Sequence, residues 1–262
     1  MNNQTFLEQA AESLWQAGLK NAGIAPLTEA RPELTLDDAY AIQLLTVAKA
    51  QAAGRRIVGK KIGLTSKAMQ DSFGISTPDY GHLYDSMLWD QDEPISLARL
   101  HRPKIETELA FVLSADLTGP GVTVTDVLQA TAGVIASFEI IDSRIRDWKI
   151  KVTDSIADNA SAAGLTLGSR LAPVGGLDLR YIGMVVEKNG LIVDTAATAA
   201  VMGNPAQTVA WLANKLGQYG ISLKKGEIIL SGSLTKALDV AGGDVFTAHF
   251  GGIGSVKAVF KE

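Results

Sequence analysis

The sequence predicts a mixed α+β protein in which a helical N-terminal segment precedes a body rich in β-strands. Three observations indicate this class: a helical period through the first 53 residues, strand-like runs after Gly54, and helical intervals between those runs. No internal repeat or low-complexity linker divides the 262 residues. We therefore expect one domain over 1–262, with a helical subregion at 1–53 and a mixed β-rich body at 54–262.

Two helices are expected in the N-terminal segment. Apolar residues recur every three to four positions from Phe6 to Ala17 and again from Leu36 to Ala50. The second run starts with two aspartates, which are favoured in the first turn of a helix. The connecting loop is expected to hold Pro26 and Pro32.

Short strands are expected after Gly54, separated by glycine, proline and aspartate turns. The runs that indicate them are RIVGKKIGL, IETELAFVL, IGMVVEKNGLIV, EIILSG and SVKAVF. The segment EKNGLI in the third run predicts a hairpin turn at Asn189 and Gly190. Two intervals, Thr125 to Ala136 and Pro205 to Tyr219, predict helices instead.

Composition narrows the kinds of partner. The chain is 47% hydrophobic and 20% charged with a formal net charge of -4, and its basic residues are scattered, so nucleic acid is not expected. No long apolar run or signal peptide is apparent, which predicts a cytoplasmic protein without a membrane partner. The absence of cysteine excludes disulfides, thiolate zinc sites and cysteine nucleophiles. Small molecules or proteins are the expected partners.

Two glutamates stand two residues apart in the strand-like run RPKIETELAFVL. Alternate side chains of a strand share a face, so Glu106 and Glu108 point to the same side as Ala110 and Val112. Two carboxylates this close repel each other unless water or a cation separates them, and a divalent ion is the usual solution. A solvated edge strand explains the same pattern without an ion.

A third glutamate, Glu139, lies inside the apolar run GVIASFEIID. An unpaired carboxylate there would cost several kcal/mol to desolvate. It could share a metal with Glu106 and Glu108, form a buried ion pair with Arg144 or Arg146, or stay protonated. Three oxygen ligands without cysteine or clustered histidine favour a hard ion, Mg²⁺ or Mn²⁺.

Several motifs together resemble a known family. They are GKKIGLTSKAMQ, TPDYG, PKIETELAFVL, FEIIDSRIRDWKI, DSIADNAS, VAWLANKL, EIILSGS and GIGSV. They are similar to the 2-hydroxypenta-2,4-dienoate (2-oxopent-4-enoate) hydratases, which belong with 4-oxalocrotonate decarboxylases and 2-oxohept-3-enedioate hydratases to the fumarylacetoacetate-hydrolase-like superfamily. The resemblance covers nearly the whole chain. It implies a β-rich fumarylacetoacetate-hydrolase-like fold with a helical N-terminal segment, dependence on Mg²⁺ or Mn²⁺, and a homo-oligomer.

The resemblance also implies roles for individual residues. Glu106, Glu108 and Glu139 match the family's metal ligands. Lys61 and Asp79 match its catalytic positions, and Lys61 can move protons if burial and the metal lower its pKa towards neutrality. Lys60 is then expected to point to the other face of its strand. The implied substrate-binding residues are Leu64, Asn159, Ser161 and Ser233.

The implied activity is that of a lyase. It is a hydratase that adds water to 2-hydroxypenta-2,4-dienoate to give 4-hydroxy-2-oxopentanoate in the meta-cleavage degradation of aromatic compounds. Decarboxylation of 4-oxalocrotonate (2-oxo-3-hexenedioate) to the same dienoate and CO₂ is an alternative that uses the same site, and hydration of 2-oxohept-3-enedioate is a second. The family's hydratases often carry Cys-Gly where this chain has Ala162 and Ala163, which bears on the subfamily.

Four cations would decide between these activities if they reach the substrate. A second, distal carboxylate would need a partner, and the candidates lie in SRIRDWKIK: Arg144, Arg146, Lys149 and Lys151. Alternating charges beside an aromatic residue also fit an exposed strand. A different class of function stays open, in which the chain is chiefly a partner subunit in a complex with a neighbouring pathway enzyme.

Overall fold

The computed structural model describes residues 2–262, apart from the side chains at positions 68, 72 and 73. The chain begins with two long helices, α1 (Asn3–Lys20) and α3 (Leu36–Ala52). Both predicted helices are confirmed. The loop between them carries a short helix that was not predicted, α2 (Leu27–Ala30). A capping box between Thr35 and Asp38 starts α3.

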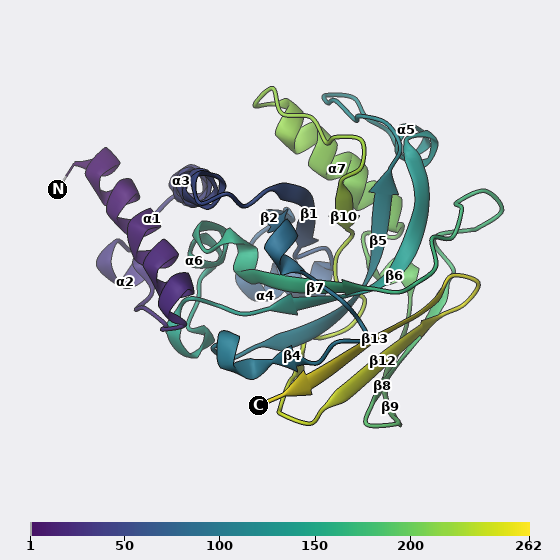
Figure 1. Cartoon of the computed structure of the whole chain (residues 1–262). Coiled ribbons are helices and arrows are strands. Elements are labelled where there is room, and N and C mark those ends of the chain that lie inside the picture. The colour runs from purple at the N-terminus through teal and green to yellow at the C-terminus, as the bar shows by residue number, and fades with distance from the viewer. Residues whose placement is uncertain (1) are drawn as a thin grey trace.

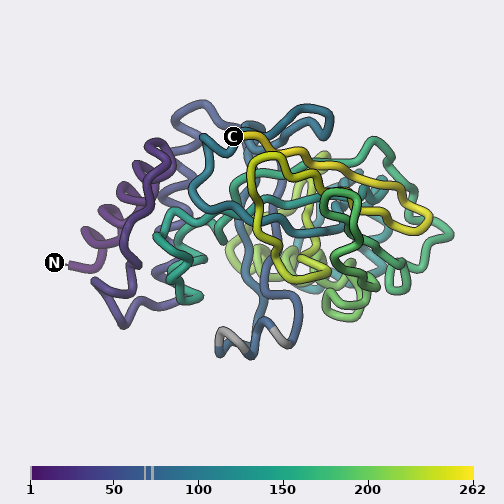
Figure 2. Tube along the Cα trace, turned by 90° about the horizontal axis from the view of Figure 1, so that it is seen from below, coloured from purple at the N-terminus to yellow at the C-terminus, as the bar shows by residue number. Residues whose placement is uncertain are grey.

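These helices lie at one end of the molecule, and the C-terminal strands lie towards the other end (Figure 1, Figure 2). Leu7 and Ile42 pack in a buried cluster with Ile156 of α6 (Val152–Ala157). The hydroxyl of Thr28 donates to the buried carboxylate of Asp154 over 2.7 Å. The helical segment is therefore fixed to the body by both apolar and polar contacts.

A large curled sheet forms the body (Figure 1). Its order within the described residues is β2-β1-β10-β5-β6-β7-β3, with β11 paired to β5. Strands β1 and β10 are parallel, and β5 is antiparallel to both β10 and β6. The strands are β1 (Ile57–Gly63), β2 (Asp79–Tyr84), β3 (Leu88–Trp89), β5 (Lys104–Leu113), β6 (Thr131–Ile141), β7 (Ala162–Leu167), β10 (Ile228–Leu230) and β11 (Leu238–Asp239).

A smaller sheet has the order β4-β13-β12-β8-β9. Its strands are β4 (Ile95–Ser96), β8 (Gly183–Lys188), β9 (Leu191–Ala197), β12 (Val245–Phe250) and β13 (Gly254–Lys261). The predicted hairpin turn between β8 and β9 is confirmed. Asn189 and Gly190 both have positive φ, 55° and 79°, as a type I′ turn requires.

Three further helices connect the strands: α4 (Lys67–Phe73), α5 (Val124–Gln129) and α7 (Pro205–Gly217). The helix predicted at 205–219 is confirmed to within two residues. The helix predicted at 125–136 is wrong beyond Gln129, because β6 begins at Thr131. β-branched residues, including Val134 and Ile135, favour a strand there, and pairing with β5 along nearly all of β6 fixes it.

The two faces of the large sheet have different surroundings. Phe111 and Phe138 lie on one face, in the main core with Leu212 of α7 and Phe246 of β12. The opposite face carries a smaller apolar cluster that includes Ala110 and, further along β5, the two glutamates. One end of this second face is therefore apolar and the other end acidic. Among the described residues, no helix has the length and apolar character needed to cross a membrane.

Candidate metal centre and active site

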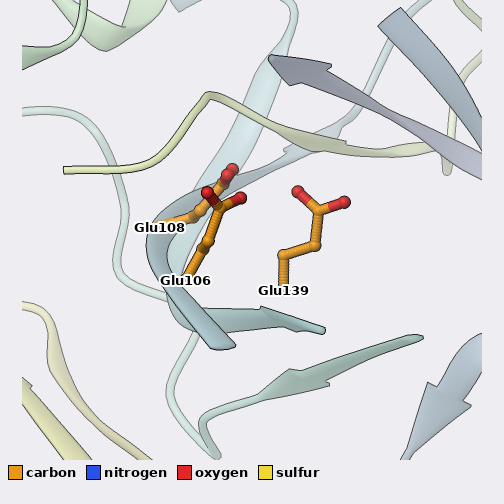
Figure 3. Close-up of side chains that lie close together, drawn as sticks. All are labelled: Glu106, Glu108 and Glu139. Atoms are coloured by element: carbon orange, nitrogen blue, oxygen red, sulfur yellow. The ribbon is translucent and has the colours of Figure 1, made fainter. Parts of the chain in front are cut away.

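Three glutamates converge on the second face of the large sheet (Figure 3). Glu106 and Glu108 extend from β5, and the register places Glu139 of β6 directly opposite Glu106. One carboxylate oxygen from each of the three lies within 4.8 Å of the others. Strand alternation brings the first two together, as predicted, and strand pairing brings the third.

Burial makes this cluster electrostatically costly without a cation. Burial raises the pKa of Glu139 to about 7, although the ammonium of Lys61 opposes the rise. Burial also raises the pKa of Glu108 well above its ordinary value, and the carboxylates of Glu139 and Glu106 add to this. Like charges so close together cannot all ionise unless a positive charge is placed between them.

The hydrogen bonding of the cluster is incomplete within the described residues. Oε2 of Glu139 and Oε1 of Glu108 have no hydrogen-bond partner there, and Oε1 of Glu139 has only the ion pair with Lys61. The other oxygen of Glu108 accepts a hydrogen bond of 2.8 Å from the backbone N–H of Gly232. Buried carboxylate oxygens that point to one spot without donors fit a hard divalent cation, which oxygen ligands bind preferentially. The three glutamates would hold it.

Lys61 lies beside this cluster on β1, and its Nζ is 3.1 Å from Oε1 of Glu139. The ion-pair partner of Glu139 is therefore Lys61, and not Arg144 or Arg146. Burial by itself lowers the pKa of Lys61, but the surrounding carboxylates, led by that of Glu139, outweigh it and raise the pKa. Without a bound metal, Lys61 is an ammonium, so burial alone does not bring its pKa towards neutrality.

Asp79 begins β2 and pairs with Gly63 of β1. A Cβ added to Gly63 would lie 2.3 Å from Oδ1 of Asp79 and 3.5 Å from Nζ of Lys61. The bare glycine thus leaves room for the carboxylate and the ammonium on one side of the sheet. Asp79 is only 3% exposed, and burial raises its pKa. The structure brings Lys61 and Asp79 together, as the resemblance implied.

Lys60 points to the other face, as predicted. Its Nζ forms an ion pair of 2.7 Å with Glu227, and both side chains are largely buried. The two adjacent lysines therefore have separate environments.

The predicted residues Asn159 and Ser161 lie in a tight turn with an unusual backbone. Asn159, Ala160 and Ser161 have φ values of 55°, 49° and 56°, a left-handed conformation that is strained for residues with a Cβ. The side chain of Asn159 accepts from the N–H of His82 at 2.7 Å and donates to its carbonyl at 2.9 Å. The amide of Asn159 thereby holds the turn against β2.

This turn approaches the lysine side of the site. The carbonyl oxygen of Asn159 would lie 2.4 Å from a Cβ on Gly81, and Gly81 pairs with Lys61. The hydroxyl of Ser161 is buried and has no hydrogen-bond partner among the described residues. A substrate that offers an acceptor could use it.

The other two predicted substrate-binding residues flank the cluster. Leu64 follows β1 with a positive φ of 55°, and its carbonyl accepts from Gln70 over 2.9 Å. The hydroxyl of Ser233 donates to the carbonyl of Thr235 over 2.8 Å. Contacts of these residues with a substrate stay predictions.

Sequence reasoning missed the role of Gly232. It has a φ of 112°, and a Cβ there would lie 2.3 Å from the hydroxyl oxygen of Thr65. Only glycine fits this conformation and this close approach. The glycine in the quoted segment SGS was the available signal, but its backbone N–H bond to Glu108 depends on a fold that brings β10 beside β5.

Comparison with known proteins identifies the family of the chain. Residues 63–261 match the family described as fumarylacetoacetate (FAA) hydrolase C-terminal. A 2-hydroxyhexa-2,4-dienoate hydratase of Comamonas testosteroni is 45% identical over 264 residues, which cover 100% of each chain. A 2-keto-4-pentenoate hydratase of Paraburkholderia xenovorans (strain LB400) is 45% identical over 255 residues, 97% of this chain and 95% of the relative.

A solved structure is also similar over nearly its whole length. It is the 4-oxalocrotonate decarboxylase from Pseudomonas putida G7, complexed with magnesium and adipate, with a TM-score of 0.95 and 39% identity over 99% of this chain and 98% of that one. The β-rich fold with a helical N-terminal segment is thereby confirmed. Because the family match spans most of the chain and these relatives span all of it, the chain belongs to the fumarylacetoacetate (FAA) hydrolase family and is an enzyme of the lyase class.

Proposed function

We propose that this chain is a divalent-metal-dependent hydratase that converts 2-hydroxypenta-2,4-dienoate and water into 4-hydroxy-2-oxopentanoate in the meta-cleavage degradation of aromatic compounds. The observation that carries this proposal is the buried glutamate cluster beside Lys61 and Asp79. The names of the two 45% identical relatives, both hydratases of short dienoic or enoic 2-oxo acids, support the substrate class.

Mg²⁺ is the proposed ion, with Glu106, Glu108 and Glu139 as its protein ligands and Mn²⁺ as a substitute of the same hard character. When bound, the ion supplies a Lewis acid for the carboxylate and 2-oxygen of the substrate.

The proton transfers are assigned to the two residues beside the cluster. Lys61 gives its proton to C5 of the dienol and takes up the enol proton in its place, and an α,β-unsaturated ketone results. Asp79 takes a proton from the water that adds at C4. A proton returned to C3 completes the product, so one water is consumed. These two groups must therefore stay close to each other and shielded from bulk solvent, as their burial allows.

Substrate contacts are proposed for Leu64, Asn159, Ser161 and Ser233. Ser161 has the strongest support, because its buried hydroxyl has no partner among the described residues. Asn159 is engaged with the backbone of His82, so its proposed contribution is to hold the turn that presents Ser161.

The second candidate activity is decarboxylation of 4-oxalocrotonate, which is favoured by the similarity to the solved decarboxylase. It requires a cation for the distal carboxylate. Arg144 is already bonded to Asp158 and to the carbonyl of Ala162, and Arg146, Lys149 and Lys151 are exposed. The cations that most affect the pKa values of the three glutamates are Lys61 and Lys104, and none of these four, which favours hydration over both dioate reactions.

A steady-state assay tests the proposal. EDTA-treated protein is incubated separately with 2-hydroxypenta-2,4-dienoate and with 4-oxalocrotonate, with and without added Mg²⁺ or Mn²⁺. Metal-dependent formation of 4-hydroxy-2-oxopentanoate supports the hydratase. Metal-dependent CO₂ release from 4-oxalocrotonate without dienoate hydration moves the function to decarboxylation, and inertness towards both contradicts each assignment.

Assembly and location are further parts of the proposal. We propose a homo-oligomer, supported by the edge strand β9, on which Leu191, Ile192 and Val193 are exposed. A complex with a neighbouring pathway enzyme and a cytoplasmic location are proposed on the family resemblance. A single domain over 1–262, with the helical subregion 1–53 joined to a catalytic body 54–262, is supported by the buried cluster that the two parts share.

A further inference from the structure

A cavity lies between the N-terminal helices and the body. Its volume is about 300 Å³, at the lower end of the range for small-molecule pockets. Residues of α1, α3 and the segments 84–89 and 157–163 line it. Within the described lining, none of the glutamates of the cluster appears, and neither do Lys61 and Asp79. The cavity is therefore not the metal centre itself, although Asn159 of the turn at 159–161 also lines it.

A buried hydroxyl without a partner lines this cavity. Tyr84 is 3% exposed, and its hydroxyl has no hydrogen-bond partner among the described residues. A buried donor left unpaired is unfavourable, whereas one that meets a ligand acceptor is not. The site thus offers a hydrogen bond to a molecule that fits the cavity.

The charges around the hydroxyl favour an anion. Arg55 lines the cavity with its guanidinium carbon 5.0 Å from the ring centre of Trp15, and no carboxylate of the described residues forms an ion pair with it. On another wall, Arg144 is paired with Asp158. Burial raises the pKa of the Tyr84 hydroxyl to about 12, and both guanidinium groups oppose that rise, which shows that their positive potential reaches it.

The acidic groups in the described lining offset this potential only in part, because Asp142 and Asp158 face three guanidinium groups, those of Arg55, Arg99 and Arg144. Asp158 is held by Arg144. The two oxygens of Asp142 accept 2.7 Å hydrogen bonds from the backbone N–H groups of His101 and Arg102. An incoming anion therefore meets Arg55 as a cation without a carboxylate partner.

The rest of the lining is largely apolar. It includes Leu14, Trp15, Met87, Trp89 and Leu100. We propose that this cavity is a second ligand site that binds a small monocarboxylic acid, with the carboxylate at Tyr84 and Arg55 and a flat apolar body among these side chains. The proposal does not depend on the proposed function.

Calorimetric titration with benzoate tests the site directly. We expect one saturable site with the same Kd in Mg²⁺-loaded and in EDTA-treated protein, because no glutamate of the metal centre takes part. Benzamide, which has nearly the same shape but no charge, is expected to bind at least about tenfold more weakly. Binding that requires Mg²⁺, equal binding of benzamide, or no saturable binding at millimolar benzoate would overturn the proposal.

Two substitutions with matched controls locate the binding. Tyr84→Phe removes only the hydroxyl, and Arg55→Gln removes the charge; each is expected to raise the Kd for benzoate about tenfold. Tyr181→Phe and Arg56→Gln change an exposed tyrosine and an exposed arginine that do not line the cavity and are expected to leave the Kd unchanged. Unaltered binding in both cavity variants would place the ligand elsewhere and sink the idea.

Discussion

Lys60 and Lys61 are neighbours in one strand, and strand alternation gives them opposite environments. Lys61 faces the glutamate cluster, 3.1 Å from Glu139, whereas Lys60 is paired with Glu227 on the other face. Substitutions at the two positions can therefore be compared to distinguish a loss of catalysis from a loss of stability when a buried ammonium is removed.

Lys61→Met is expected to lower kcat for hydration by at least about 100-fold, because it removes the proposed proton donor. The affinity for Mg²⁺ should stay equal or rise, since an ammonium beside Glu139 opposes a second cation. Steady-state kinetics and calorimetric Mg²⁺ titration measure the two effects.

Lys60→Met is the matched control. It removes the ammonium that pairs with Glu227 and should lower the free energy of unfolding by about 3–5 kcal/mol. The kcat per folded molecule should stay unchanged. An unchanged kcat in Lys61→Met would exclude the proposed role.

His82 is a buried imidazole whose protonation opposes folding. Burial lowers its pKa to about 3, and the nearby ammonium of Lys60 adds to this. Between the unfolded value of about 6.5 and this folded value, the unfolded chain binds the extra proton. The stability that His82 contributes as a neutral group is therefore present above pH 6.5 and is lost as the pH falls.

His82→Gln should reduce the loss of unfolding free energy between pH 6 and pH 4 by up to about 1.4 kcal/mol per pH unit. Urea unfolding at several pH values, compared with the unaltered protein, measures this difference. His249→Gln, which replaces an exposed histidine, controls for histidine replacement as such. Parallel stability curves for His82→Gln and the unaltered protein would contradict a neutral His82.

Among the elements, the turn at 159–161 packs closely against β2 at a position without a side chain, Gly81. The carbonyl oxygen of Asn159 would lie 2.4 Å from a Cβ on Gly81. The side-chain amide of Asn159 is hydrogen-bonded to the backbone of His82. A side chain at Gly81 must therefore displace the turn that carries Ser161.

Gly81→Ala is expected to destabilise the protein by about 1–3 kcal/mol through overpacking and to reduce kcat/KM by about tenfold or more, because small displacements of positioning groups are costly to catalysis. Gly183→Ala is the matched control, since Gly183 also lies in a strand and a Cβ there meets nothing within 4 Å. Kinetics together with urea unfolding of both variants provide the readout. Full activity in Gly81→Ala would show that the turn does not position the substrate.

At the scale of the whole molecule, the metal centre couples folding to metal binding. The glutamates come from β5 and β6 and are assembled only in the folded chain, so an ion that binds them stabilises the native state. Mg²⁺ at 100 times its Kd should raise the free energy of unfolding by about 2.7 kcal/mol, and EDTA should reverse the gain.

Glu106→Gln removes one ligand and should weaken Mg²⁺ binding by more than about 100-fold, with a parallel loss of activity and of the stabilisation by Mg²⁺. Glu33→Gln, at an exposed glutamate, should keep both. Urea unfolding with and without Mg²⁺ measures the stabilisation. Equal stabilisation of Glu106→Gln and Glu33→Gln by Mg²⁺ would contradict the assignment of the metal centre.

Strand faces and turns follow from local period and turn chemistry, and these can be recognised from neighbouring residues. The alternation of β5 placed Glu106 and Glu108 on one face, and Asn189 with Gly190 fixed the hairpin between β8 and β9. Motif resemblance added the expected fold and the matching of Lys61 and Asp79. The strand faces and the hairpin needed only the residues close to each position, whereas the resemblance drew on motifs along nearly the whole chain.

Which distant residues meet depends on long-range strand pairing and packing. These made residues 131–136 part of β6, placed Glu139 opposite Glu106, and brought Gly232 to Glu108. Long-range packing also pairs Arg144 with Asp158. It places Tyr84 and Arg55 in the lining of the cavity beside the N-terminal helices. The physical reason is that pairing and burial between segments far apart in the chain override local propensity, and no local pattern encodes the partner of a strand.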